Sequence, residues 1–232
     1  MMAKILFVMS GARHLTLADG TEHPTGFWAE EFAAPYLAFT AAGHEVIVAT
    51  PGGVVPTVDQ ASLAPEVNGG QDGADAIAAT LRSAKELRSP IALEGIDPAR
   101  YAAVFYPGGH GPMEDLAADA DSARVLATAM DADMPVGLVC HGLAALLATG
   151  RPDGTSPFTG YQVTGFTKEE ETLAGLADRV KWLLEDRLVS LGVRFSAGEP
   201  WAPHVVVDRN VHTGQNPASS AALAAELLKT LG

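Results

Sequence analysis

The alternation of two kinds of segment along the chain predicts an α/β fold. Short apolar runs, each of the length of a buried strand, alternate with longer stretches of helical periodicity. This pattern is typical of a parallel sheet covered by helices on both faces. No linker, charge block or internal repeat divides the 232 residues. We therefore expect one domain over residues 1–232, a flavodoxin-like sandwich with a mainly parallel sheet.

The expected strands are short and apolar. Residues 4–9 read Lys-Ile-Leu-Phe-Val-Met, and a run without polar alternation is typical of a strand buried on both faces. Near the end of the chain, the turn Asp208-Arg209-Asn210 between two valine-containing runs predicts a hairpin. The expected strands are residues 4–9, 45–50, 101–106, 136–139, 161–164, 205–207 and 211–213.

Helical periodicity fills most of the intervening segments. Residues 27–42 carry apolar side chains at helical spacing, with Pro35 expected to bend the helix. Pro217 stands at the first position of the last helix, where its missing N–H loses no bond. Residues 51–65 are rich in Gly and Pro and predict a long loop. The expected helices are residues 27–42, 75–88, 119–132, 142–149, 179–191 and 217–231.

Composition excludes several classes of function. The formal net charge is −13 and there is no basic stripe, so neither nucleic acid nor an anionic membrane is an expected partner. The apolar runs are too short to cross a bilayer, and the first residues lack the apolar core of a signal peptide. A single cysteine excludes an intramolecular disulfide, which favours a reducing, cytoplasmic setting.

That cysteine, Cys140, is the most informative residue of the chain. It ends the apolar run 136–139 and is followed by His141, Gly142 and a helix-forming segment. A strand therefore delivers the thiol to a sharp strand-to-helix turn, and a helix N-terminus favours negative charge on sulfur. This arrangement predicts an activated nucleophile with a lowered pKa. The alternative is a small buried apolar residue, which most lone cysteines are.

Other candidate groups meet Cys140 at the carboxyl edge of the predicted sheet, where open α/β sheets place their sites. Gly108-Gly109-His110-Gly111 follows the strand that ends at Tyr106 and can present backbone N–H groups to an oxyanion. No Lys-Ser/Thr pair follows it in P-loop spacing, so it is a weak phosphate cradle. The alternative interpretation of this loop is a tight exit from the strand.

Two acidic segments are further candidates. The pair Glu30-Glu31 lies in an otherwise apolar stretch, where a buried carboxyl would keep its proton. An exposed acidic pair on a helix is the alternative. The segment Lys168-Glu169-Glu170-Glu171 follows Thr167, and here the alternative is a solvated helix start whose acids complement the helix dipole.

Aromatic residues and histidines complete the set of candidates. Phe27, Trp28, Phe166 and Trp201 are either pocket walls or core, and Trp201, set between prolines in an expected loop, is the best pocket candidate. The seven histidines include no His-x-His or His-x₃-His pair, so their spacing predicts no metal site.

Taken together, these segments resemble the ThiJ/PfpI superfamily, from the first strand to the last helix. The nearest branch in appearance is the heat-inducible, chaperone-like proteins that act as glutathione-independent glyoxalases (glyoxalase III). The motifs that carry the resemblance are Val139-Cys140-His141-Gly142, Gly109-His110-Gly111, Thr25-Gly26 with Glu31 and Pro35, Val163-Thr164-Gly165-Phe166-Thr167 with Glu171-Thr172, and the run 213–219.

The resemblance implies a role for each matching position. Cys140 matches the nucleophile and His141 the adjacent general base. Glu171 matches the acid that orients the histidine, and Glu31, rather than Glu30, matches the carboxyl that hydrogen-bonds the sulfur. Gly109 and the backbone of His141 match the oxyanion donors, with His110 and Trp201 beside the substrate.

Two related architectures fit less well. The α/β-hydrolase elbow has Gly two residues before its nucleophile, where this chain has Leu138. Class I glutamine amidotransferases, which share the general architecture, use a late His-x-Glu pair. Here His204 is followed by two valines and His212 by Thr-Gly, so glutamine hydrolysis is not expected.

The resemblance implies a glyoxalase III-type lyase (D-lactate dehydratase) that converts methylglyoxal or a similar small dicarbonyl to a 2-hydroxy acid without a cofactor. It also implies a homodimer. Two alternatives stay open, a holdase-type stress chaperone that does not need Cys140, and a thiol hydrolase of small amides, peptides or isonitriles. A low-pKa thiol would also suit a redox sensor.

Overall fold

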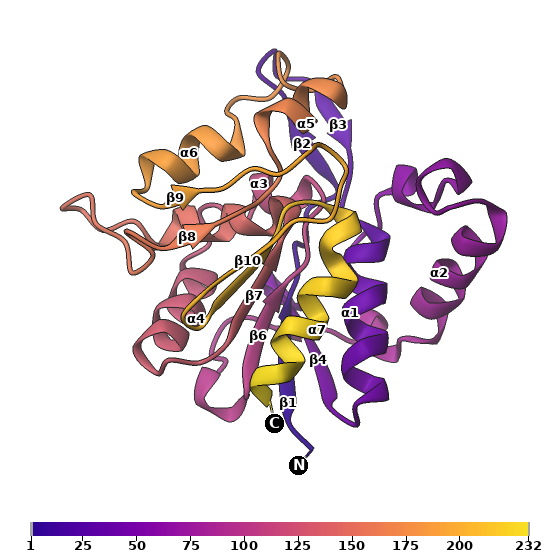
Figure 1. The fold of residues 1–232 in the computed structure, drawn as a ribbon, viewed down its shortest axis with the longest axis horizontal. Helices are drawn as coiled ribbons and strands as arrows, with labels where there is room; N and C mark the ends of the chain where they lie inside the picture. The colour runs from indigo at the N-terminus through magenta and orange to yellow at the C-terminus, as the bar shows by residue number, and fades with distance from the viewer. Residues whose placement is uncertain (1, 232) are drawn as a thin grey trace.

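The structure, a computed structural model, describes residues 2–231 and confirms the α/β fold (Figure 1). Within these residues the main sheet has seven strands, in the order β10-β11-β7-β6-β1-β4-β5. Neighbouring strands are parallel except for the hairpin β10–β11 at one edge. The strands are β1 (Lys4–Val8), β4 (Glu45–Thr50), β5 (Ile91–Ala92), β6 (Ala103–Tyr106), β7 (Val136–Val139), β10 (Val205–Asp208) and β11 (Val211–Gly214).

Helices cover both faces of this sheet. α1 and α7 lie side by side on one face, and α4 with the 3₁₀ segment η6 lies on the other (Figure 1). Among the described residues, none of the helices combines the length and the apolar character that a bilayer crossing requires. The α-helices are α1 (Ala29–Ala41), α2 (Gln71–Ser83), α3 (Gly111–Glu114), α4 (Ala120–Asp131), α5 (Lys168–Leu173), α6 (Leu184–Ser190) and α7 (Ser220–Leu231). The 3₁₀ segments are η1 (Pro51–Gly53), η2 (Gln60–Leu63), η3 (Pro65–Val67), η4 (Lys85–Arg88), η5 (Pro98–Arg100), η6 (Cys140–Thr149) and η7 (Pro217–Ser219).

Two small sheets lie outside the main one. β2 (His14–Thr16) pairs with β3 (Glu22–Pro24) in antiparallel fashion, and β8 (Gln162–Val163) pairs in parallel with β9 (Arg194–Phe195). The β2–β3 hairpin and α5 stand together above the carboxyl edge of the main sheet (Figure 1). The sequence analysis missed β2, β3, β5 and β9, which are two or three residues long and carry little periodicity. Of these segments, β3 contributes His23 and Pro24 to a recess beside the candidate residues.

Three expected helices differ from the structure. Of residues 179–191 only α6 is helical, because the carbonyl of Arg179 accepts a 2.8 Å hydrogen bond from Ala18 in the β2–β3 turn instead of continuing a helix. Residues 75–88 divide into α2 and η4. The expected α-helix 142–149 is the 3₁₀ segment η6, which starts at Cys140 and is buried along most of its length.

The core beneath α1 is aromatic. The fully buried Phe7 on β1 lies with its ring centroid 4.9 Å from that of Phe105 on β6 and 5.9 Å from that of Phe39 on α1. Phe39 and Phe105 also meet edge to face at 6.0 Å. Such pairs contribute beyond the area they bury. They fix α1, and with it the first helical turn that carries Glu31, against the sheet.

Two substitutions on α1 test this anchoring. Phe39→Ala is expected to lower the free energy of unfolding by roughly 3–5 kcal/mol, because it leaves a cavity among three packed rings. Leu37→Ala, two residues away and 51% exposed, is expected to change it by less than about 0.5 kcal/mol. Urea denaturation of both variants measures the difference. Equal losses would mean that the aromatic cluster does not anchor the helix.

Candidate active site

Cys140 lies at the end of β7 in a strained conformation. Its φ is 57°, in the left-handed region that residues other than Gly rarely occupy. The elbow also needs Gly142, because a Cβ there would strike the carbonyl oxygen of Tyr106. The sharp turn holds the sulfur at the floor of a pocket of about 80 Å³, while the residue as a whole is only 4% exposed.

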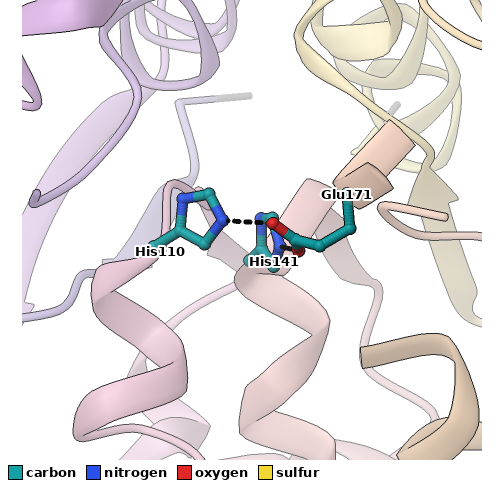
Figure 2. A group of neighbouring side chains, drawn as sticks. All are labelled: His110, His141 and Glu171. Carbon is teal, nitrogen blue, oxygen red and sulfur yellow. Dashed lines mark hydrogen bonds and ion pairs between the residues drawn. The ribbon is translucent and has the colours of Figure 1, made fainter. Parts of the chain in front are cut away.

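His141 stands between the sulfur and a carboxylate. Its Nδ1 lies 3.4 Å from Cys140 Sγ, and its Nε2 lies 2.7 Å from Glu171 Oε2. Figure 2 shows the second of these contacts. A carboxylate accepts only from a protonated nitrogen, so the hydrogen bond assigns the proton to Nε2 and leaves a lone pair on Nδ1 facing the thiol. This is the geometry of a base that can take the thiol proton.

Glu171 accepts a second hydrogen bond, from His110. His110 Nε2 lies 2.8 Å from Oε1, so one carboxylate joins two imidazoles (Figure 2). Burial alone would raise the pKa of Glu171, but the neighbouring His141 and His110 outweigh it and hold the pKa below its ordinary value. Burial lowers the pKa of His141, and the neighbouring His110 lowers it further. The carboxylate is therefore ionised and His141 is a neutral base.

The local sequence explains how α5 presents Glu171. Thr167 caps this helix and forms a reciprocal capping box with Glu170. The buried Glu170 also accepts hydrogen bonds from the Trp201 backbone N–H (2.9 Å) and from Asn216 Nδ2 (2.8 Å). The sequence indicated no separate role for Glu170. The pattern Thr-x-x-Glu at a helix start was the signal that could have found it.

Glu31 approaches the sulfur from the other side. It lies in the first turn of α1, is fully buried, and its Oε2 accepts a 2.7 Å hydrogen bond from the Gly108 N–H. Its Oε1 is buried with no hydrogen-bond partner among the described residues. Burial raises the pKa of Glu31 to about 8. The carboxyl therefore carries its proton at neutral pH, whereas its neighbour Glu30 is partly exposed.

The thiol does not have the lowered pKa that the sequence predicted. Burial, the negative charge of Glu31 and its hydrogen bond raise the pKa of Cys140. The backbone N–H groups of Gly109 and His141 oppose this shift without reversing it. The segment that follows the thiol is the 3₁₀ segment η6 in place of the expected α-helix. Cys140 is therefore a protonated thiol, with His141 Nδ1 3.4 Å away as an acceptor for its proton.

The loop 108–111 approaches the site more closely than a side chain would allow. A Cβ on Gly108 would lie 2.7 Å from both Glu31 Oε2 and the His141 nitrogen, and Gly109 has a φ of 87°. Glycine at these positions lets the Gly108 N–H reach Glu31 and the Gly109 N–H point toward the sulfur. The N–H groups of Gly109 and His141, which lie beside the sulfur, can serve as oxyanion donors.

Aromatic side chains close the catalytic pocket. Trp28, Phe166 and Trp201 line it together with Gly109 and His110, whereas Phe27 is core. Trp201 has a φ of 62° and its ring centroid lies 5.6 Å from that of Phe166. Because apolar walls exclude water, they strengthen electrostatic interactions between the polar groups of the pocket and a bound molecule.

The fold also assembles a group of possible metal ligands that histidine spacing could not indicate. The ligand atoms of His110, His141 and Glu171 lie within 4.8 Å of one another. Two imidazoles and a carboxylate are a ligand set that suits Zn²⁺ and other transition metals. Here the same atoms are joined by hydrogen bonds, so a cation would have to replace two N–H protons.

Comparison with known proteins identifies the family. The DJ-1/PfpI family matches residues 23–230. The chain belongs to this family. The expected ThiJ/PfpI resemblance is thereby confirmed, and the sheet with helices on both faces is the family's flavodoxin-like fold.

Similar proteins come from several organisms. Human glutamine amidotransferase-like class 1 domain-containing protein 1 is 38% identical over 148 residues, 64% of this chain and 67% of that protein. Protein/nucleic acid deglycase HchA of Staphylococcus aureus is 29% identical over 230 residues, 94% of this chain and 76% of that protein. Among solved structures, glyoxalase III of Candida albicans has a TM-score of 0.85 at 25% identity, covering 99% of this chain and 97% of that one.

The rate of Cys140 alkylation as a function of pH tests the raised thiol pKa. Iodoacetamide reports on this thiol alone, because the chain has one cysteine. We expect an apparent pKa above the ordinary value of about 8.5. Glu31→Gln should lower it, because the carboxylate charge no longer opposes the thiolate. A wild-type pKa below about 8.5 would contradict the raised pKa and would support the activated thiolate that the sequence predicted.

The buried Glu31 carboxyl also predicts how stability depends on pH. With a pKa of about 8 in the folded protein against an ordinary 4.5, folded Glu31 holds its proton where the unfolded chain has lost it. The free energy of unfolding should therefore fall as pH rises between these values, by at most about 1.4 kcal/mol per pH unit.

Urea unfolding at pH 5 and pH 8 measures this contribution as the difference between wild type and Glu31→Gln, which should lack it. Glu169→Gln alters an exposed carboxyl on α5 and should keep the wild-type slope. If Glu31→Gln showed that same slope, Glu31 would be ionised in the folded protein.

Proposed function

We propose that this protein is a glutathione-independent glyoxalase that converts methylglyoxal or a similar small 2-oxoaldehyde to a 2-hydroxy acid. The observation that carries the proposal is the placement of His141 between the Cys140 thiol and the Glu171 carboxylate, with protonated Glu31 near the sulfur. The likeness to glyoxalase III of Candida albicans over nearly the whole chain supports it.

In the first step, Cys140 Sγ attacks the aldehyde carbon while His141 Nδ1 takes the thiol proton. A carbon–sulfur bond forms, and the carbonyl π electrons move to oxygen. The N–H groups of Gly109 and His141, which lie beside the sulfur, would stabilise that oxyanion. The imidazolium then returns its proton to the oxygen, which gives a neutral hemithioacetal and regenerates the base.

In the second step, a base removes the proton from the former aldehyde carbon while the neighbouring carbonyl oxygen gains a proton, which gives an enediol. The neighbouring carbon then gains a proton as the hydroxyl on the sulfur-bearing carbon loses its own. The neutral His141 is the available base, because Glu31 keeps its proton at neutral pH and can serve as the acid. The product is a 2-hydroxy thioester. Water hydrolyses it to the 2-hydroxy acid and frees the thiol. One carbon is oxidised and its neighbour reduced, so the reaction consumes no external oxidant or reductant.

The pocket suits a substrate of this size. Its volume of about 80 Å³ is far below the roughly 300–1,000 Å³ typical of pockets for drug-sized ligands. The aromatic walls supplied by Trp28, Phe166 and Trp201 leave few polar partners other than the catalytic groups.

Lactate formation from methylglyoxal without glutathione tests the proposal. Wild-type protein should consume methylglyoxal and form lactate in equal amounts. Cys140→Ala should lose the activity by at least about 10³-fold, because no bond to the substrate can form. Glu171→Gln should lower kcat by roughly 10²–10⁴-fold, because His141 loses the partner that orients it as a base.

The unfolding curve of each variant serves as the control for folding. Turnover by Cys140→Ala at the wild-type rate would overturn the proposal. Faster lactate formation from a preformed adduct of methylglyoxal with an amine than from methylglyoxal alone would instead indicate deglycation, as the name of the Staphylococcus aureus relative suggests.

A further inference from the structure

A larger recess adjoins the catalytic pocket on one side. It has a volume of about 540 Å³, and its wall includes Trp28, His110 and Ala174, which also line the catalytic pocket. The catalytic pocket alone accommodates only the reacting carbons of a substrate. A substrate that occupies both spaces would place its oxoaldehyde end at Cys140 and the remainder in the recess.

Two arginines without carboxylate partners line this recess. Arg13 precedes β2, and Arg179 lies between α5 and α6. Both are exposed, and neither forms an ion pair with another of residues 2–231. The chain has 28 acidic residues and only 15 Lys and Arg. Two unpaired guanidinium groups on one recess of such an acidic protein are available to a ligand.

The other polar groups of the recess leave this positive charge largely uncompensated. Asp59 is buried, and its carboxylate already accepts hydrogen bonds from Thr25 Oγ1 (2.7 Å) and the Ala61 N–H (3.0 Å). His23 is neutral at pH 7, because burial and the neighbouring His110 lower its pKa. The nearby Asp19 attracts Arg179 electrostatically, but it forms no ion pair with it, accepts hydrogen bonds from Thr21 and does not line the recess.

A second recess beside the catalytic pocket has the opposite charge. It has a volume of about 350 Å³, shares Trp28, Trp201 and Pro217 with the catalytic pocket and is lined by Glu30 and Glu66. An anionic group would be repelled from that recess and attracted to the one lined by the arginines. The charges of the two recesses therefore determine which way an anionic substrate would lie in the site.

We propose that Arg13 and Arg179 bind the anionic end of the substrate, so that the preferred substrates are 2-oxoaldehydes carrying a carboxylate or a phosphate. Guanidinium groups bind either anion through paired N–H donors. This inference rests on the proposed glyoxalase function and adds the class of substrate to it.

The test compares three 2-oxoaldehydes at equal ionic strength. They are 4,5-dioxopentanoate, its uncharged methyl ester, and methylglyoxal. We expect wild-type kcat/KM for the acid to exceed that for the ester by at least tenfold. The double substitution Arg13→Gln/Arg179→Gln should lower kcat/KM for the acid to the level of the ester, mainly through KM. It should leave the values for the ester and for methylglyoxal within twofold.

Controls separate the recess from general charge effects. Arg151→Gln removes an exposed arginine that lines none of these spaces and should keep the preference for the acid. The phosphate ester of 3-hydroxy-2-oxopropanal, compared with 4,5-dioxopentanoate, decides whether phosphate or carboxylate is favoured. Equal kcat/KM for the acid and the ester, or an unchanged preference in the double variant, would overturn the inference.

Failure of the proposed function has a different signature, since none of the three oxoaldehydes would then be consumed. The recess is still testable by binding of 4-oxopentanoate, a keto acid without the aldehyde, followed by tryptophan fluorescence because Trp28 lines both spaces. Saturable binding that is lost in the double variant would support an anion site. Absence of binding to the wild type would exclude it.

Discussion

Hydrogen bonds from two imidazoles to one buried carboxylate hold the candidate site together. Glu171 comes from α5, outside the main sheet, whereas His141 and His110 follow β7 and β6 within it. The carboxylate thus ties the upper layer of the molecule to the sheet edge. It also sets the proton on His141 Nε2, and this leaves Nδ1 free to face the sulfur. Without the Glu171 carboxylate, nothing would fix the orientation of the His141 ring or decide which of its nitrogens carries the proton.

A second carboxylate supports the first. Glu170 is not at the sulfur, yet it closes the capping box of α5 and holds the Trp201 backbone and Asn216. These contacts place the start of α5 and an aromatic wall of the pocket relative to each other. The two neighbouring glutamates therefore make separate contacts. Glu171 binds the two histidines, and Glu170 binds the segments that form the pocket wall.

Burial governs the protons of the site. The thiol of Cys140 and the carboxyl of Glu31 share a dry environment, and burial raises the pKa of both. The charge of Glu31 and its hydrogen bond raise the pKa of the thiol further, whereas the thiol's hydrogen bond lowers that of Glu31 without reversing the shift. Both are protonated at neutral pH, so His141 is the group that can accept a proton. Under the proposed function, reactivity of the thiol is coupled to the arrival of a substrate whose carbonyl accepts the electron pair, and no thiolate is required in the resting protein.

The sequence by itself determined the α/β class, the buried strands and the elbow at Cys140, because these depend on local apolar patterning and on residues adjacent in the chain. The resemblance to the ThiJ/PfpI superfamily added Glu31 and Glu171. Only the tertiary structure decided that His110 shares Glu171, that residues 179–183 are not helical, that η6 is a 3₁₀ segment, and that Arg13 and Arg179 line one recess. The direction of the Cys140 pKa shift was decided there as well. These properties arise from burial and from contacts between segments far apart in the chain, and no local pattern encodes the dielectric or the partners that a side chain meets after folding.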